Sequence, residues 1–335
     1  MGRTLRPMGQ GNFLKAGLAA LAVLATGTAV GTALAQSAAP PPEPIHPPAH
    51  AMGWPDTSGW LPFQGPELRR GRSARQMLAQ RRRLDEALDS LEPHREGTMD
   101  AYVIAIALDS DPVFAREARE AGNVLSRRYG AEGRTLVLAG PDGRSGGLPQ
   151  GSISALAISL ARISEMIDPA EDVLVLYSTS HGYDEGLAYN YGDGGYGILS
   201  PSYLGTMLGE LGFDRRILMI SACYSGIFVP YLGTSDTAII TAASSDRTSF
   251  GCRAENDWTY FGDALINHAL RQPDPLMIAA ENARQSIAEW EAQGGLQSSQ
   301  PQVQIGDNAR QWLRTLETRI PREATQPVGA PAIGE

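Results

Sequence analysis

Cysteine and lysine are scarce in this chain: two of its 335 residues are cysteine, and one, Lys15, is lysine. The sequence contains no C-x-x-C, no H-E-x-x-H and no cluster of cysteine with histidine, so the common metal-binding motifs are absent. We therefore expect neither a metal nor another cofactor. With a formal net charge of −9, the chain is a poor candidate for binding nucleic acid or an anionic membrane surface.

Beyond its N-terminal region, the chain also lacks an apolar run of membrane-spanning length. Residues 16–32 are rich in Ala, Leu, Val and Gly, follow a basic stretch, and precede an A-x-A motif at 33–35. This order predicts a cleaved signal peptide at 1–35, and hence an exported protein, periplasmic or secreted, without stable membrane insertion. The alternative is an uncleaved N-terminal anchor, because the segment is nearly long enough to span a bilayer.

Composition divides the remaining residues into four parts. Residues 36–66 are rich in Pro, Gly, Ala and Ser, which predicts an extended linker. Residues 67–98 place apolar side chains at helical spacing among Arg and Glu, which predicts an amphipathic helix. Residues 99–318 contain the apolar runs of a folded domain, and residues 319–335 have the composition of a flexible tail.

Short apolar runs and helical patterns alternate through the predicted domain. The apolar runs predict strands at 101–108, 134–139, 172–178, 216–222, 237–243 and 303–305. The helical patterns predict helices at 113–129, 152–167, 202–211, 260–270 and 275–292. Strands that are apolar along their whole length are typical of a parallel sheet covered on both faces. The sequence therefore predicts an α/β fold with a mostly parallel central sheet.

Two of these predicted strands end in residues that can perform chemistry. The strand at 172–178 leads into His181 and Gly182, and the strand at 216–222 leads into Cys223. Because the ends of neighbouring parallel strands meet at one edge of a sheet, we expect His181 and Cys223 to lie close together. An imidazole in that position can raise the thiolate fraction of a cysteine or accept its proton. The N–H groups of Gly182 and Cys223 could hold an oxyanion.

Taken alone, each of these residues has a simpler interpretation. A histidine after a strand is usually a surface residue, and a lone buried cysteine usually serves packing. In an exported protein, Cys223 and Cys252 could also form a structural disulfide, which would silence a catalytic thiol. The joint placement of His181 and Cys223 after neighbouring strands favours a cysteine nucleophile with a histidine base.

An apolar strand that ends in His-Gly, followed by one that ends in Ala-Cys, resembles the caspase-like cysteine peptidases. Within that group the chain is most similar to the legumain family, peptidase family C13, and to its bacterial exported members. The resemblance covers about residues 100–302, in DPVFAREARE, AEDVLVLYSTSHG, SACYSG and TAASSDRTSFGC followed by TYFGD. It implies a caspase-like three-layer α/β/α sandwich. It also implies His181 as general acid and base, Cys223 as nucleophile, and Gly182 in the oxyanion hole.

The resemblance further implies a polar substrate pocket that selects Asn, and less often Asp, before the cleaved bond. Arg116, Ser249 and Asp263 match the residues of that pocket. Arg and Asp together can donate to and accept from a carboxamide. Ser221 is a departure, because the family commonly carries Glu two residues before the nucleophile.

A second departure concerns the histidine. The asparagine that helps to position it in the family is not evident near Phe114, although Asp109 or Ser110 could stand in. These departures bear more on the preference for Asn than on the chemistry of cysteine and histidine.

The sequence therefore predicts a cysteine endopeptidase that acts on protein or peptide substrates and cleaves after Asn or Asp. Transpeptidase and self-processing activities are further possibilities. The alternative hypothesis is a non-catalytic caspase-like binding or scaffold protein of the cell envelope, in which the amphipathic helix and the linker dock a partner. The oligomeric state stays open.

Overall fold

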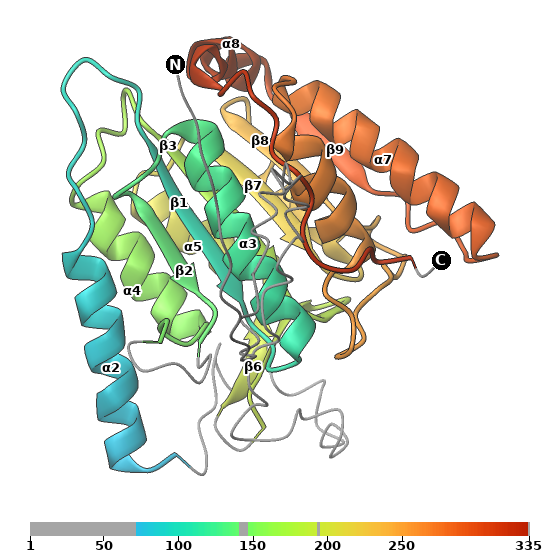
Figure 1. The fold of residues 1–335 in the computed structure, drawn as a ribbon. Helices are drawn as coiled ribbons and strands as arrows, with labels where there is room; N and C mark the ends of the chain where they lie inside the picture. The colour runs from blue at the N-terminus through green and yellow to red at the C-terminus, as the bar shows by residue number, and fades with distance from the viewer. Residues whose placement is uncertain (1–71, 141–146, 193–194, 334–335) are drawn as a thin grey trace, which may run out of the picture. The chain divides into compact units, whose positions relative to one another are not determined.

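The structure, a computed structural model, describes residues 72–140, 147–192 and 195–333 (Figure 1). The predicted signal peptide, 1–35, and the predicted linker, 36–66, lie outside the described residues. Within the described ranges, no helix is both long and apolar enough to cross a membrane.

A six-stranded sheet forms the centre of the fold, in the order β2-β1-β3-β7-β8-β9. Its strands are β1 (Ala101–Ala107), β2 (Thr135–Leu138), β3 (Val173–Thr179), β7 (Arg216–Ser221), β8 (Thr237–Thr241) and β9 (Gln302–Ile305). All neighbours pair in parallel except β9, which joins β8 in antiparallel orientation at the edge. Every residue of β1, β3 and β7 is buried, which is why these strands are continuous apolar runs in the sequence. The prediction of an α/β fold with a mostly parallel sheet is confirmed.

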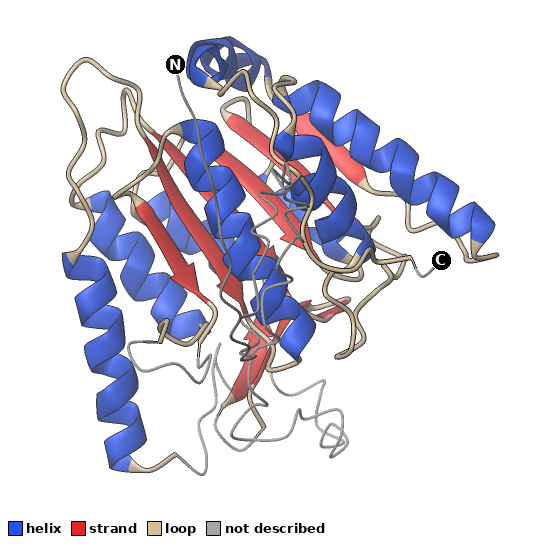
Figure 2. Cartoon of the chain, viewed as in Figure 1, coloured by secondary structure: helices blue, strands red, loops and turns tan. Residues whose placement is uncertain are grey.

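Helices cover both faces of this sheet, as Figure 2 shows. Alternate side chains of β1 belong to two different cores, with Val103 on one face and Ile104 on the other. The first face carries α3 (Pro112–Tyr129), α7 (Leu276–Gln293) and α8 (Asp307–Leu316). The second face carries α2 (Ala74–Asp89), α4 (Ile153–Ser164) and α5 (Pro201–Glu210). The three layers of the predicted α/β/α sandwich are therefore present.

A small antiparallel sheet was not predicted. It consists of β4 (Gly182–Tyr183), β5 (Gly186–Asn190) and β6 (Tyr196–Leu199), in that order. Sequence analysis missed it because this stretch is rich in Gly and Tyr and contains no long apolar run. The sheet matters for the site, since β4 begins directly after His181.

Several helical segments are shorter or wound differently than the sequence patterns predict. The helix predicted at 260–270 is a π-helix, η3 (Gly262–His268), continued by the 3₁₀ turn η4 (Ala269–Arg271). Other short segments are η2 (Ser225–Phe228), α6 (Val229–Leu232) and η5 (Glu317–Arg319). A π-helix inside a fold often lies at a functional site.

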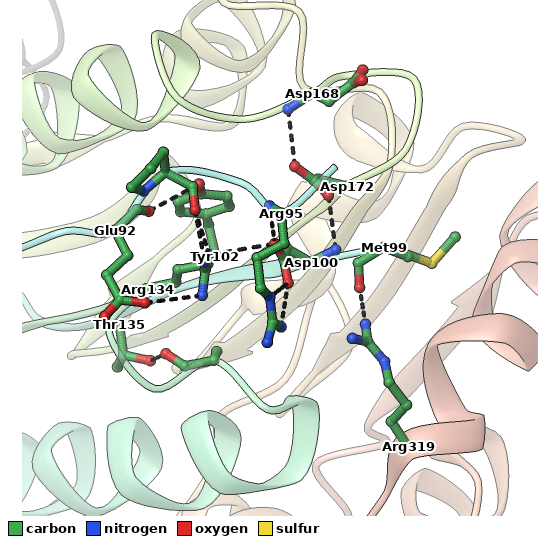
Figure 3. A network of polar contacts seen from close by, with 12 residues as sticks. Glu92, Arg95, Met99, Asp100, Tyr102, Arg134, Thr135, Asp168, Asp172 and Arg319 are labelled. Atoms are coloured by element: carbon green, nitrogen blue, oxygen red, sulfur yellow. Dashed lines mark hydrogen bonds and ion pairs between the residues drawn. The ribbon is translucent and has the colours of Figure 1, made fainter. Parts of the chain in front are cut away.

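Buried carboxylates tie the amino-terminal ends of β1 and β3 together (Figure 3). Asp172 accepts hydrogen bonds from the backbone N–H groups of Asp100, at 2.7 Å, and Asp168, at 2.9 Å. Asp100 accepts from the backbone and guanidinium of Arg95 and lies 3.4 Å from Nε of Arg134. This network aligns the two strands at the end of the sheet opposite the predicted chemistry.

The segment predicted as a flexible tail, 319–335, is hydrogen-bonded to the domain along its described part. Its backbone groups at Val328, Ala330 and Ala332 bond to the side chains of Asp257, Trp258, Asp263 and Asn267 at 2.8 to 3.1 Å. Val328 and Ala332 also pack against the core of the first face. The segment therefore lies along the loop and π-helix that contain predicted pocket residues.

Candidate active site

The pairing of β3 with β7 aligns the ends of the two strands after which the predicted catalytic residues lie. Thr179 of β3 lies opposite Ser221 of β7. His181 and Cys223 each follow two residues later, and the backbone N–H of Ser180 still donates to the Ser221 carbonyl at 3.1 Å. The structure thus brings His181 and Cys223 to one edge of the sheet, as the sequence predicted.

Gly182 lies against the backbone of the nucleophile candidate. A Cβ atom added at Gly182 would lie 2.0 Å from the carbonyl oxygen of Cys223 and 3.0 Å from Cβ of Ala222. No side chain fits in that space, so glycine is required for the two strand ends to approach. This contact supports the predicted closeness of Gly182 and Cys223.

The chain turns sharply after Cys223. Tyr224 has φ of 56°, in the left-handed region, and donates its N–H to the carbonyl of Arg247 at 2.7 Å. A non-glycine residue in this region is strained, and such strain often occurs at functional sites. The turn ends β7 abruptly and separates the thiol from η2.

The imidazole of His181 lies between a carboxylate and an aromatic ring. Its Nε2 is 3.3 Å from Oδ2 of Asp111, and its ring lies 4.9 Å from that of Phe114 in an edge-to-face arrangement. Asp111 is the N-cap of α3, four residues after the end of β1. The contacts with Asp111 and Phe114 restrict the orientation of the ring.

The sequence analysis offered Asp109 or Ser110 for orienting His181, and did not name Asp111. In the structure, Asp109 accepts a hydrogen bond from the backbone N–H of Asp111 at 2.9 Å. The ligand atoms of Asp109, Asp111 and His181 lie within 4.8 Å of one another, so both carboxylates face the imidazole. The signal that could have found Asp111 is its position before Pro112, at a helix start that follows a strand.

The carboxylates favour the protonated imidazole. Burial alone would lower the pKa of His181, but the hydrogen bond that its Nε2–H donates to Asp111 and the charges of Asp109, Asp111 and Cys223 together raise it above its usual value. His181 is therefore poised to hold a proton near neutral pH.

Ser249 and Cys252 surround the sulfur of Cys223. The backbone N–H of Ser249 donates to Sγ at 3.3 Å, and the carbonyl and hydroxyl oxygens of Ser249 lie at 3.6 and 3.7 Å. The thiol of Cys252 also hydrogen-bonds to this sulfur. Both cysteines are free, so the structure holds no disulfide between them.

These contacts favour a thiolate at Cys223. The hydrogen bond from Cys252 lowers the pKa of Cys223, burial opposes it, and Ser249 and His181 lower it further, to about 6. The same hydrogen bond and burial raise the pKa of Cys252 well above its usual value. Cys252 therefore stays protonated and donates to the thiolate.

Arg116 holds a loop beside the predicted pocket. Its Nη1 donates to the carbonyl of Ala254 at 3.1 Å and to that of Asn256 at 2.5 Å, and its Nε lies 3.7 Å from Asp257. The loop that it binds runs between Ser249, which contacts Cys223, and η3. The guanidinium is thus placed next to the segment that carries the other predicted pocket residues.

Asp263 and Ser221 make internal contacts. The carboxylate of Asp263 is fully buried and accepts hydrogen bonds from Asn267 and from the backbone N–H of Ala332, both at 2.8 Å. The hydroxyl of Ser221 lies 3.1 Å from that of Thr259. Of the predicted pocket residues, Ser249 therefore lies on the thiol, while Asp263 and Ser221 bond to neighbouring elements.

A buried carboxylate beneath the site escaped the sequence analysis. Glu117 of α3 is fully buried and accepts hydrogen bonds from the hydroxyl of Tyr177, at 2.5 Å, and from the N–H and hydroxyl of Thr259, at 2.9 and 2.8 Å. A Cβ atom at Gly262 would lie 2.0 Å from this carboxylate. The sequence could have revealed Glu117 by its position on the apolar face of α3. A charged side chain that is buried there requires hydrogen-bond partners.

Asp109, Asp111 and His181 also have the ligand types of a metal site. Their ligand atoms lie within 4.8 Å of one another. Asp109 accepts from the N–H of Asp111, and Asp111 contacts His181, so we interpret the cluster as one that orients the imidazole.

The chain is similar to a known family in sequence and to a known protein in structure. Residues 158–310, which include His181 and Cys223, match the model of the Peptidase C13 family. That family comprises cysteine-type peptidases, which act on protein substrates. Caspase-1 from Spodoptera frugiperda is similar in structure, with 14% identity, a TM-score of 0.42, and coverage of 64% of this chain and 88% of that chain. No curated protein matches this chain in sequence.

The pH dependence of Cys223 alkylation tests the environment of the thiol. We expect the rate with iodoacetamide to level off above an inflection near pH 6, because the thiolate forms there. Below the inflection the rate should fall about tenfold per pH unit. Cys252 should stay unmodified over the same range, because its pKa is raised. Peptide mapping by mass spectrometry separates the two thiols, and a single inflection near the usual thiol pKa would contradict the assignment.

Replacement of Glu117 tests the buried network. Glu117→Gln places an amide donor against the N–H and hydroxyl donors of Thr259, so we expect the free energy of unfolding to fall by about 1–3 kcal/mol. Urea denaturation measures this change. The control is Glu210→Gln, at an exposed helix end, where a change within about 0.5 kcal/mol is expected. Equal stability of the two variants would show that the network contributes nothing.

Proposed function

We propose that this protein is a cysteine endopeptidase in which Cys223 is the nucleophile and His181 the general acid and base. The observation that carries the proposal is the pairing of Thr179 with Ser221, which brings both residues to one edge of the sheet. The lowered pKa of Cys223 and the contact of His181 with Asp111 support it. The peptidase C13 match over this region supports the same reaction class.

The reaction begins with attack of the Cys223 thiolate on the carbonyl carbon of the cleaved peptide bond. The N–H groups of Gly182 and Cys223 hold the developing oxyanion. His181 donates its proton to the leaving amine, and then removes a proton from water as the acyl-enzyme is hydrolysed. An amine in place of that water gives the transpeptidase reaction. Asp111 stabilises the imidazolium and keeps its Nε2 side fixed, so the proton moves through Nδ1.

Cleavage after Asn or Asp is the specificity that we propose, with Arg116, Ser249, Asp263 and Ser221 as substrate-binding residues. Ser249 contacts the thiol, and Arg116 binds the loop that begins a few residues later. The substrate side chain would therefore enter between Cys223 and this loop. A natural substrate within the protein itself, such as the N-terminal linker, would make the enzyme self-processing.

A second candidate is a non-catalytic binding or scaffold protein. The internal hydrogen bonds of Asp263 and the carbonyl contacts of Arg116 favour it, because both groups must also be available to a substrate in the first proposal.

Hydrolysis of fluorogenic peptides decides between the two candidates. With Asn or Asp before the cleaved bond, we expect Cys223→Ala and His181→Ala to lower kcat/KM by about 1,000-fold or more. His94→Ala is the matched control, because His94 lies at the opposite end of the sheet near Asp172. Peptides with Gln in place of Asn test the pocket. Equal rates for the wild-type protein and Cys223→Ala would exclude the catalytic proposal and leave the scaffold.

We also propose that the protein is an exported bacterial peptidase, periplasmic or secreted. The support is the order of basic, apolar and A-x-A segments in residues 1–35. On expression of the full chain in a bacterial host, N-terminal sequencing of the exported protein should begin at Gln36. A membrane-bound protein that retains residues 1–35 would show the uncleaved anchor instead.

A further inference from the structure

The second cysteine of the chain lies at the nucleophile. Cys252 hydrogen-bonds through its thiol to the sulfur of Cys223, although the two residues come from different segments. Ser249, three residues before Cys252, donates its N–H to the same sulfur at 3.3 Å. The loop from Ser249 to Cys252 therefore lies at the sulfur of Cys223.

Cys252 also packs near the residues that contact the imidazole of His181. Its side chain packs against an apolar cluster that includes Val113 and Phe114, and Phe114 contacts the ring of His181 at 4.9 Å. This packing leaves Cys252 partly buried, as is Cys223.

The segment that carries Cys252 is the loop that Arg116 holds at the carbonyls of Ala254 and Asn256. It follows Gly251, whose φ is 88°, and it belongs to neither a helix nor a strand. Its local bonds are a turn from the N–H of Asn256 to the carbonyl of Arg253 and a side-chain bond from Asn256 to the carbonyl of Gly251. A loop of this kind permits the approach that a sulfur–sulfur bond requires.

We propose that Cys223 and Cys252 form a reversible redox site, in which Cys252 is the resolving thiol that converts oxidised Cys223 into a disulfide. The disulfide stops the peptidase until a dithiol reduces it. Only this effect on activity rests on the proposed function, because formation of the bond requires the two thiols alone.

The oxidant is a peroxide. The Cys223 thiolate attacks one peroxide oxygen, so that an S–O bond forms, the O–O bond breaks, and hydroxide leaves. Sulfur loses two electrons, and the peroxide gains them. The sulfur of Cys252 then attacks the sulfenic sulfur of Cys223. The S–S bond forms, the S–O bond breaks, and the oxygen leaves as water with the proton of Cys252.

Formation of the disulfide protects Cys223 from further oxidation. A sulfenic acid that meets more peroxide goes on to the sulfinic acid, which a dithiol does not reduce. An adjacent thiol intercepts the sulfenic acid first, because the reaction within the protein needs no diffusion. The disulfide is thus the form from which activity returns.

Peptide mapping of the full chain tests the proposal without an activity assay. Trypsin cleaves after Arg216, Arg247 and Arg253, so Cys223 and Cys252 fall in two separate peptides, 217–247 and 248–253. After treatment with hydrogen peroxide we expect these two peptides to be linked, and the intact protein to be about 2 Da lighter. Dithiothreitol should abolish the link and restore iodoacetamide labelling at Cys223. Sulfinic acid at Cys223 beside a reduced Cys252 would overturn the proposal, and so would the absence of oxidation.

Variants at position 252 give the complementary result. In Cys252→Ser and Cys252→Ala, peroxide should convert Cys223 to the sulfinic acid, with no recovery by dithiothreitol. Recovery equal to that of the wild-type protein would contradict the role of Cys252. If both variants fail to fold, the wild-type map still decides. A linked pair in a protein that hydrolyses no Asn or Asp peptide would uphold the redox site and reject the peptidase proposal.

Discussion

The parallel pairing of β3 with β7 is the constraint on which the site depends. It aligns Thr179 with Ser221, so the residues two positions further on reach one edge at the same level. The backbones then approach so closely at Gly182 and the Cys223 carbonyl that no Cβ atom fits between them. A shift of either strand by one residue would turn the side chains to the opposite face and separate the imidazole from the thiol.

Around this pair, the site is built from elements that lie far apart in the sequence. α3 contributes Asp111 at its N-cap, which contacts His181, and Glu117 nearly two turns later, which binds Thr259. The loop from Ser249 onward contributes an N–H and a second thiol to the sulfur of Cys223. Burial strengthens these polar contacts, because little water competes for the charged groups. The pKa of the thiol and that of the imidazole therefore move in opposite directions, toward an ion pair.

Much of the fold could be predicted from the sequence because β1, β3 and β7 are buried on both faces and are apolar throughout. Their ends marked His181 and Cys223, and parallel pairing of neighbours was enough to place the two together. The small sheet from β4 to β6 was missed, because its Gly- and Tyr-rich strands have no simple periodicity. The sequence analysis named Asp109 or Ser110 as the orienting residue. Asp109 lies in one cluster with His181, but Asp111, whose carboxylate contacts the imidazole, was not named. The direction of a side chain at the start of a helix depends on one or two residues, which the sequence pattern does not fix.

The sequence by itself determined the α/β class, the mostly parallel sheet, and the candidate nucleophile and base, since strand burial and strand order are local patterns along the chain. Only the tertiary structure decided which groups surround them. The contact of Cys252 with Cys223, the buried bonds of Glu117 to Tyr177 and Thr259, and the docking of the C-terminal segment on Asp263 each join residues from separate elements. Such contacts depend on packing in three dimensions, which leaves no periodic signal in the sequence.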